Sequence, residues 1–405
     1  MKKRVLALIF AIVLTFGMIG MFASCGNYAE TNEKIKIGIS GPLTGGAAMY
    51  GVAVENSAKL AVEEINAKGG LNGILFEVVM LDDKHDANNI STNYAALYEG
   101  GMQVSLGTVT TKPGLEFKEY AYADNVFFLT PSATGDDIPS YSNGYQMCFA
   151  DSDQGTVSAQ VFGEQYKGKK VGIFYKSDDD YSVGIKNNFV AALDKSFGTP
   201  VEASFSDATA TSFKQQVSKL KDCDVIFMPI YYDPAAQFMK DGNGVIKNNA
   251  IYYGCDGLDG IDSVEGFDIN LIPQCVSYLS HFNSNSTTGA AGAYIAAYRA
   301  KYGKDATVNQ FGAAAYDCVY AIYEGMKYAV EKNGATITKN IAPSDLCNIL
   351  TAVFDSKDFK FRGITGAPEA DGKSTITWNE NGTATNGHVK KNPVSYVVKE
   401  ATNAQ

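Results

Sequence analysis

The feature that most constrains this chain is a regular alternation of strand-like and helix-like segments, which begins at residue 35 and begins again near residue 171. Ile35–Ser40 alternates as a strand does. In Val52–Lys68 apolar residues recur at the three- and four-residue spacing of an amphipathic helix, which Gly69 and Gly70 stop. Such alternation favours parallel sheets with helices on both faces. The restart therefore predicts an α/β protein of two similar lobes.

The same patterns predict further elements along the chain. Before the restart they are strands at 76–81, 103–106 and 126–129 and a helix at 87–99. After it they are strands at 171–175, 201–205 and 225–229 and helices at 183–196 and 212–220. The near-continuous apolar run Val171–Tyr175 is typical of a parallel strand that is buried on both faces.

The N-terminal segment is typical of an export signal rather than of a fold. A basic start at residues 2–4 precedes an apolar stretch that ends in small residues. The segment Phe22–Cys25 resembles a bacterial lipobox, which implies cleavage before Cys25 and a diacylglycerol on its sulfur. We therefore expect a signal peptide at 1–24 and a lipidated tether at 25–33, with the exported chain anchored to the outer face of the cytoplasmic membrane, at the cell surface or in the periplasm. An uncleaved transmembrane anchor is the alternative.

The composition excludes several classes of function. Among 405 residues, 34 Lys and Arg stand against 44 Asp and Glu, a net charge of −10, and there is no basic stripe. Because phosphate contacts supply most nucleic-acid affinity, we expect no nucleic-acid partner. The histidines (His85, His281 and His388) are scattered and no Cys-x-x-Cys pair occurs, so we expect no metal and no cofactor. Beyond Cys25 six cysteines remain, for which both disulfides and buried thiols are open.

The loops that follow the expected strands are the candidate ligand site, because ligands of open parallel sheets bind beyond the carboxyl ends of the strands. These loops are 41–50, 108–114, 131–136, 178–181, 229–234 and 255–260. They carry hydroxyls, glycines, tyrosines and one well-placed carboxylate, Asp256, but no histidine. Without a histidine in the loops no nucleophile is expected beside a base, so we expect no catalytic residue and no enzyme.

A set of short motifs occurs in a defined order in and beside these loops. The motifs are Gly38–Gly45, Tyr50-Gly51, Asn66–Gly73, Asp82-Asp83, Thr130–Thr134, Tyr231–Pro234, and Gly363–Gly366 with Trp378–Gly382. The set resembles the periplasmic-binding-protein type 1 family, and within it the leucine/isoleucine/valine-binding-like receptors of ABC transporters. The resemblance implies two Rossmann-like lobes with parallel-sheet cores, joined by a three-strand hinge and closing on a ligand. It implies residues 34–151 plus 281–375 in lobe 1 and residues 152–280 plus 376–400 in lobe 2.

The resemblance assigns the ligand carboxylate to two loops of lobe 1. One holds Thr110 and Thr111, and Thr111 stands where serine is usual and offers a hydroxyl and a backbone N–H. In the other, Ser132 and Ala133 are matched as backbone contacts and Thr134 as a hydroxyl contact. Thr111 also begins a predicted helix, where free N–H groups and the helix dipole favour an anion.

The resemblance also matches aromatic side chains from both lobes. Tyr50 and, at a helix start, Phe311 come from lobe 1. Tyr181, followed by serine where glycine is usual, and the pair Tyr231 and Tyr232 come from lobe 2. Aromatic rings bury apolar surface at a small cost in conformational entropy, which suits an apolar ligand side chain.

Asp256 matches the acidic residue that receives the ligand ammonium, where the family's amino-acid binders often have glutamate. A desolvated ammonium needs a carboxylate partner, and charge-assisted hydrogen bonds are the strong ones. Beyond the signal the only arginines are Arg299 and Arg362, and neither lies in a candidate loop. This disfavours a dicarboxylate or phosphate ligand and favours a zwitterionic amino acid.

We therefore expect a monomeric, surface-anchored receptor that captures an amino acid, branched-chain or otherwise apolar, by lobe closure and delivers it to an ABC permease. Closure requires that the ligand contact both lobes. The alternatives within the fold are a urea- or amide-binding receptor and a ligand sensor. Urea and amides lack an ammonium, so Asp256→Ala would then cost little affinity. An exported hydrolase would need a nucleophile and a base in the cleft, and a structural lipoprotein with a degenerate cleft would bind no small solute.

Overall fold

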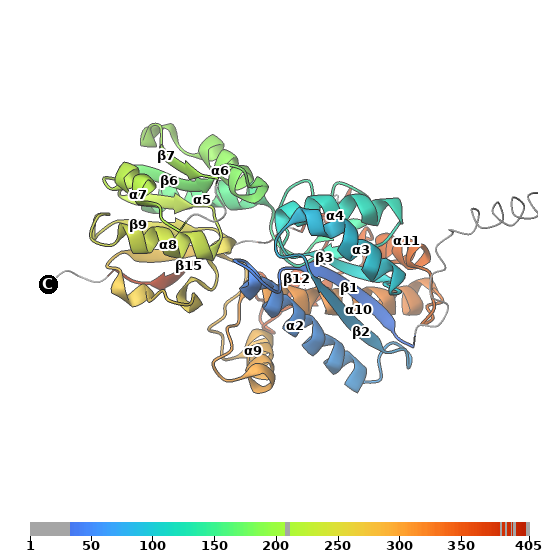
Figure 1. Ribbon diagram of the computed structural model, residues 1–405. Coiled ribbons are helices and arrows are strands. Elements are labelled where there is room, and N and C mark those ends of the chain that lie inside the picture. The colour runs from blue at the N-terminus through green and yellow to red at the C-terminus, as the bar shows by residue number, and fades with distance from the viewer. Residues whose placement is uncertain are drawn as a thin grey trace, which may run out of the picture.

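The computed structural model describes residues 33–206, 211–380, 383–384, 387–389, 391 and 394–401, which form two lobes side by side (Figure 1). The expected signal peptide, Cys25 and all of the tether except Glu33 lie outside the described residues. Within the described ranges, every helix is too short or too polar to cross a membrane.

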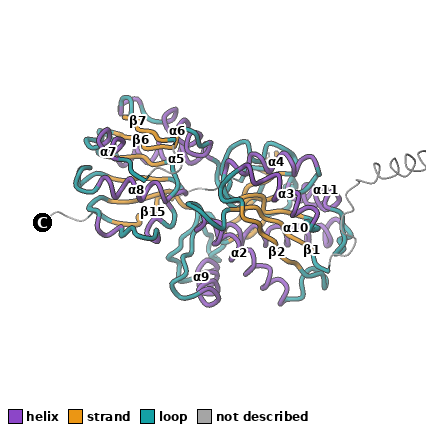
Figure 2. Tube along the Cα trace, in the orientation of Figure 1, coloured by secondary structure: helices purple, strands orange, loops and turns teal. Residues whose placement is uncertain are grey.

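Lobe 1 is built on a five-stranded sheet in the order β2-β1-β3-β4-β5, in which all neighbours are parallel. Its strands are β1 (Ile35–Gly41), β2 (Phe76–Asp82), β3 (Val104–Thr108), β4 (Phe128–Thr130) and β5 (Gly144–Gln146). Two groups of helices pack around this sheet (Figure 2). One group is α2 (Ala48–Ala67), α10 (Gln310–Asn333) and α11 (Pro343–Phe354), and the other is α3 (Ile90–Glu99) and α4 (Thr111–Ala123). Helix α9 (Gly289–Tyr302) packs beside α2.

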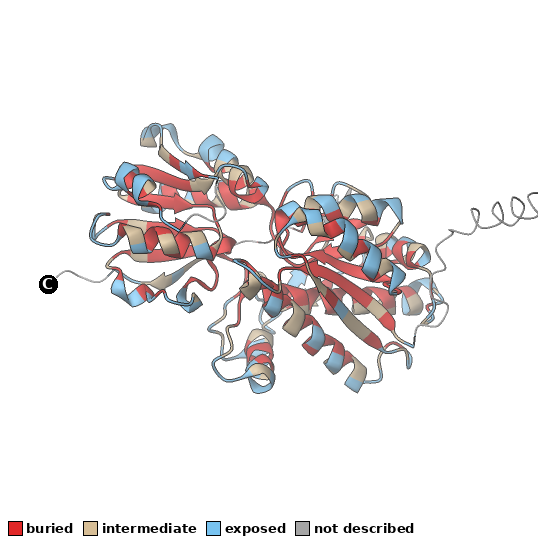
Figure 3. Cartoon of the chain, viewed as in Figure 1, coloured by how far each residue is buried: buried red, intermediate tan, exposed pale blue. Residues whose placement is uncertain are grey.

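Lobe 2 is built on a six-stranded sheet in the order β15-β10-β9-β8-β6-β7. Its strands are β6 (Val171–Lys176), β7 (Val201–Phe205), β8 (Val225–Met228), β9 (Ile251–Gly254), β10 (Cys275–Ser280) and β15 (Val394–Lys399). All neighbours are parallel except β15, which runs antiparallel to β10 at the edge. Helix α5 (Asp151–Gln165) pairs with α6 (Asp180–Ala192), and α7 (Lys214–Leu220) with α8 (Tyr232–Gly242). Helices cover the central strands of both sheets, which are accordingly buried (Figure 3).

The predicted α/β class with two parallel-sheet lobes is confirmed, with one antiparallel edge strand that the local patterns did not indicate. The predicted helix at 183–196 lies at 180–192 instead. It begins earlier because the Asp179 side chain accepts a hydrogen bond from the Ser182 N–H and caps the helix. It ends earlier because Leu193 adopts an extended conformation.

The chain crosses between the lobes three times: between β5 and α5, between β10 and α9, and before β15. Two short hairpins precede the last crossing, β11 (Phe361–Gly363) with β12 (Ser374–Ile376) and β13 (Asn379–Glu380) with β14 (Thr383–Ala384). Trp378, which the expected boundary gives to lobe 2, packs in lobe 1, with its ring centroid 4.4 Å from that of Phe354. Its indole N–H donates to the Gln146 carbonyl at 2.8 Å. The last crossing therefore follows Trp378, later than the expected boundary at 375–376.

The six cysteines beyond Cys25 are free thiols, of which five are buried. This decides between the two states that the sequence left open. Burial raises the pKa of the Cys148 and Cys255 thiols, the two nearest the cleft loops, well above the ordinary value. Because the thiolate is the nucleophile, both thiols are unreactive.

The close crossing of α5 and α6 depends on glycines. A Cβ atom at Gly155 would lie 2.7 Å from the Ile185 carbonyl oxygen and from the Phe189 nitrogen. At Gly184 it would lie 3.2 Å from Asp151 Oδ2. The two helices can therefore approach this closely because Gly155 and Gly184 have no side chains. Asp151, the first residue of α5, packs against α6 at Gly184.

Replacing Gly155 with alanine is expected to lower the free energy of unfolding by about 1–3 kcal/mol, because the new methyl group overlaps the backbone of α6. Gly163 on the same helix is exposed, with no atom within 4 Å of its Cβ position. Gly163→Ala is therefore expected to raise that free energy by about 0.5–1 kcal/mol through helix propensity. Urea unfolding of both variants measures the difference, and equal effects would contradict the close crossing.

Candidate functional site

The residues predicted to bind ligand lie at the ends of strands and the starts of helices that face the other lobe. All are buried except Tyr231, which is half-buried: Tyr50, Thr110, Thr111, Ser132, Ala133, Thr134, Tyr181, Tyr232, Asp256 and Phe311. Thr111 begins α4 and Tyr232 begins α8, while Asp256 begins the short 3-10 helix η3 (Asp256–Leu258) that follows β9. Contacts between these side chains define an aromatic part, a hydroxyl part and an acidic part of one candidate site between the lobes, which is called the cleft below.

The aromatic part is centred on Tyr50 and joins the two lobes. The Tyr50 ring centroid lies 4.2 Å from that of Phe311, 4.9 Å from that of Tyr232 and 5.9 Å from that of Tyr231. Tyr181 stacks on Tyr231 with ring centroids 4.7 Å apart. These rings form an apolar wall to which both lobes contribute.

The hydroxyl part lies at the N-terminus of α4. The hydroxyl oxygens of Thr111 and Thr134 are 3.4 Å apart. The N–H groups of the first two residues of α4 have no acceptor within the helix, because such bonds begin at Gly114, whose N–H donates to the Thr110 carbonyl at 3.1 Å. Two hydroxyls beside free N–H groups at the positive end of a helix form a corner suited to a carboxylate.

Ser132 and Ala133 have hydrogen-bond partners in β4 and in the loop that follows β3. Their N–H groups donate to the Thr130 hydroxyl at 3.4 and 3.0 Å. The Ser132 hydroxyl donates to the Val109 carbonyl at 2.7 Å. These bonds fix the loop that presents Thr134, and the contacts of Ser132 and Ala133 with a ligand remain a prediction.

The acidic part is formed by Asp256, which is 2% exposed. The Tyr181 hydroxyl donates to Asp256 Oδ1 at 2.7 Å, and the Asp256 N–H donates to Gln154 Oε1 at 3.0 Å. Burial raises the pKa of Asp256 to about 7, against the hydrogen bonds from Tyr181 and Gln154 that lower it. Among the described residues no ion pair includes Asp256. A buried carboxylate of this kind is suited to a cationic partner.

His85 also reaches the cleft, so the prediction that no histidine does so is wrong. Its ring centroid lies 5.0 Å from that of Tyr231, and Nδ1 is hydrogen-bonded to the Thr110 hydroxyl at 2.9 Å. A positive φ of 60° at His85 turns the chain after β2, which no local pattern predicted. Burial, with the charges of Lys176 and Lys112, lowers the pKa of His85 to about 4, so the ring is neutral at pH 7.

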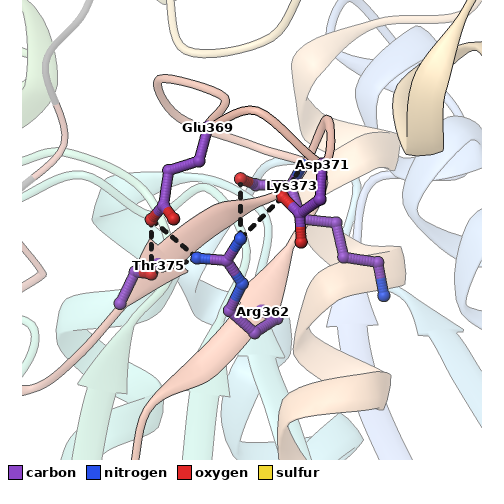
Figure 4. Close-up of polar contacts among 5 residues, drawn as sticks. All are labelled: Arg362, Glu369, Asp371, Lys373 and Thr375. Carbon is purple, nitrogen blue, oxygen red and sulfur yellow. Dashed lines mark hydrogen bonds and ion pairs between the residues drawn. The ribbon is translucent and has the colours of Figure 1, made fainter.

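Among the described residues, neither Arg299 nor Arg362 forms a hydrogen bond or ion pair with a predicted ligand-binding residue. Figure 4 shows Arg362 between Glu369 and Asp371, with nitrogen–oxygen distances of 2.6 and 2.7 Å. Arg299 lies in α9 and lines a surface groove of about 580 Å³ with Lys304 and with Asp259 and Gly260 of the candidate loop 255–260. This arrangement agrees with the argument against a dicarboxylate or phosphate ligand. In the part of the chain that the structure describes, no three His, Cys, Asp or Glu side chains are grouped as metal ligands.

Comparison with known proteins gives one consistent family. The model described as periplasmic binding protein matches residues 34–354. The leucine-, isoleucine-, valine-, threonine- and alanine-binding protein of Pseudomonas aeruginosa is 29% identical over 213 residues, which are 51% of this chain and 56% of that protein, so the match spans about half of that relative. A Leu/Ile/Val-binding protein of Rhizobium johnstonii is 26% identical over 361 residues, 87% of this chain and 90% of that protein.

A solved structure extends the similarity to nearly the whole chain. The branched-chain amino acid transporter substrate binding protein of Streptococcus pneumoniae, in complex with isoleucine, has a TM-score of 0.69 at 27% identity. The match covers 91% of this chain and 100% of that chain. At this coverage the match includes both lobes.

Proposed function

The chain belongs to the periplasmic binding protein family, and from this premise we propose that it is an extracytoplasmic receptor that binds a branched-chain or other apolar amino acid and delivers it to an ABC permease. The observation that carries the proposal is a group of buried side chains between the lobes that offers two hydroxyls at a helix N-terminus, Thr111 and Thr134, and a carboxylate without an ion-pair partner among the described residues, Asp256. The hydroxyls suit an anion and the carboxylate suits a cation. These groups match the two charges of an amino acid. The family is one of binding receptors rather than enzymes, and the proposed action involves no chemical step.

The proposed ligand contacts both lobes. Thr111 and Thr134 of lobe 1 bind its carboxylate, and Asp256 of lobe 2 binds its ammonium. The rings around Tyr50 and Tyr231 enclose its apolar side chain. Binding energy is therefore gained only when the lobes are closed, which is the differential affinity that drives closure. The printed names of the relatives in Pseudomonas and Rhizobium support an amino acid with an aliphatic side chain.

The anchor and the assembly state are further proposals. Cys25 carries the lipid, and the receptor acts as a monomer at the outer face of the cytoplasmic membrane. The lipobox-like segment Phe22–Cys25 supports this. Cys25→Ala is expected to move the protein from the membrane fraction to the soluble fraction, and a variant that stays membrane-bound would favour an uncleaved anchor.

A thermal-shift screen tests the proposed ligand class. The panel is the twenty amino acids, urea, short amides and simple sugars. A ligand that binds only the folded state at a thousandfold excess over Kd adds about 4 kcal/mol to the free energy of unfolding. We expect shifts with leucine, isoleucine and valine. A shift with urea or amides alone would contradict the proposal and favour the alternative receptor.

Tyr50→Phe is expected to lower leucine affinity about fivefold. The Tyr50 hydroxyl donates to the Gly257 carbonyl of lobe 2 at 2.5 Å, and losing that bond destabilises the closed form by about 1 kcal/mol. Tyr145→Phe is the matched control, since it removes a hydrogen bond to Asp355 within lobe 1. Calorimetric titration is expected to show unchanged affinity for the control. Equal affinities of both variants would mean that the Tyr50 bond does not contribute to closure.

A further inference from the structure

We propose that Asp151 is a second carboxylate that binds the ligand ammonium, beside Asp256, so that the receptor requires an amino group with at least two N–H donors. The inference rests on the proposed function, because it concerns the same ligand. It assigns a specificity-determining role to a residue that the sequence motifs did not single out.

Asp151 connects the carboxylate corner to the acidic part of the cleft. It is the first residue of α5, directly after the first crossing between the lobes. Its N–H donates to the Thr134 carbonyl at 2.8 Å. Its side chain is 2% exposed. Asp151 therefore lies beside the threonine that is proposed to bind the ligand carboxylate, where the α-ammonium of the same ligand must also lie.

The Asp151 carboxylate has an unused acceptor. Oδ2 packs against α6, at the position where Gly184 lacks a side chain. Oδ1 is buried and has no hydrogen-bond partner among the described residues. One turn along α5, Gln154 accepts the Asp256 N–H with Oε1, while its Nε2 is also buried without a described partner. Buried polar atoms without partners are rare and costly, so these two atoms on the first turn of α5, where Gln154 contacts Asp256, indicate a polar group that the ligand supplies.

The charges around Asp151 favour a cation. Burial raises the pKa of Asp151 well above the ordinary value. A hydrogen bond with the Thr134 hydroxyl lowers this pKa, and the negative charges of Asp256, Asp136 and Asp179 raise it further. Among the described residues no ion pair includes Asp151 or Asp256. A ligand ammonium between Asp151 and Asp256 would supply the missing cation for both carboxylates, because one of its N–H groups can donate to Asp151 and another to Asp256.

This geometry defines the ligand class more narrowly. A primary amino acid has enough N–H donors for Asp151 and Asp256 together. A trimethylated amine has none, and the 2-hydroxy acid analogue has one uncharged donor. We therefore expect leucine to bind, and its hydroxy analogue, 2-hydroxy-4-methylpentanoate, to bind weakly.

Asp151→Asn tests the proposal by calorimetric titration with two probes. For L-leucine we expect a ten- to hundredfold loss of affinity, because a neutral amide replaces one charged acceptor. For 2-hydroxy-4-methylpentanoate we expect a change of less than about threefold, because this ligand has no ammonium to lose. Asp153→Asn is the matched control: it removes the same charge from the same helix, where Asp153 accepts a hydrogen bond from the Ala150 N–H, and it should leave leucine affinity within about threefold.

Two results would overturn the inference: unchanged leucine affinity in Asp151→Asn, or an equal loss for both probes, which would make Asp151 a purely structural residue. Failure of the wild-type protein to bind any amino acid would instead contradict the proposed function itself. If Asp151→Asn does not fold, a crystal structure of the wild-type protein with leucine decides. A ligand nitrogen within about 3.2 Å of an Asp151 oxygen supports the proposal, and one beyond about 4 Å overturns it.

Discussion

Asp256→Asn is expected to weaken leucine binding about a hundredfold or more, the largest effect of any single substitution in the cleft. Removing one partner of a desolvated charge pair costs about 2–5 kcal/mol, because the other charge stays buried. The Asn side chain keeps the size of Asp256 and an acceptor for the Tyr181 hydroxyl, which donates at 2.7 Å. The loss therefore reports the charge rather than a change in packing.

The control for this prediction is Asp180→Asn. Asp180 lies in the first turn of α6 in the same lobe and is exposed, so the variant removes the same charge without touching the cleft. Calorimetry should give it the wild-type affinity for leucine. If Asp256→Asn also binds as the wild type does, the ligand ammonium does not meet Asp256, and a ligand without an ammonium, such as urea or an amide, becomes the better explanation.

Leucine affinity is expected to fall as the pH is lowered through 7, approaching tenfold for each pH unit below that value. Burial raises the pKa of Asp256 to about 7, so the empty cleft holds a proton there below this pH. The ammonium requires the carboxylate form, and binding must displace that proton. The pKa of Asp256 also depends on four neighbouring side chains. Hydrogen bonds from Tyr181 and Gln154 lower it, and the negative charge of Asp259 raises it. Asp151 and Asp256 also interact electrostatically. Titrations between pH 5 and pH 8 measure the slope, which should be smaller in Asp256→Asn because that variant has lost one of the titrating carboxyl groups.

The stability of the empty protein is expected to respond to Asp256 in the opposite direction. Its pKa in the folded state, about 7, lies above the ordinary value of 3.8. The proton is therefore held more tightly in the folded state, and the stabilisation is complete below about pH 4 and is lost as the pH rises through 7. If leucine affinity rises with pH while the contribution of Asp256 to the free energy of unfolding falls, then Asp256 serves ligand binding at a cost in stability. A pH-independent affinity would contradict the assignment.

Most of the fold was predictable because the information is local. Val171–Lys176 has the near-continuous apolar run of a buried strand and Ala48–Ala67 has the apolar periodicity of a helix, and parallel sheets follow from the alternation of such segments. The edge strand β15 was not predicted, since it pairs with β10, more than a hundred residues earlier, and nothing in its own sequence indicates that partner. The position of the last crossing was missed for the same reason, because it depends on the packing of Trp378 against Phe354.

The candidate site was predictable where motifs place a residue at a strand end and unpredictable where packing decides. Thr111, Thr134 and Asp256 lie in such motifs. His85 was missed because a left-handed turn, rather than a motif, directs its ring to Tyr231. Asp151 was missed because an acidic residue at a helix start is ordinary capping sequence, and only the close approach of α6 makes it buried.

The measurement that tests the account most directly is a calorimetric comparison of L-leucine with two analogues, each of which lacks one of its charges. Leucinamide lacks the carboxylate that Thr111 and Thr134 are proposed to bind, and 4-methylpentanoate lacks the ammonium that Asp256 is proposed to bind. We predict that each analogue binds at least about a hundredfold more weakly than leucine, because each leaves one half of the cleft unpaired. An analogue that binds as tightly as leucine would contradict the recognition of an amino acid by both of its charges.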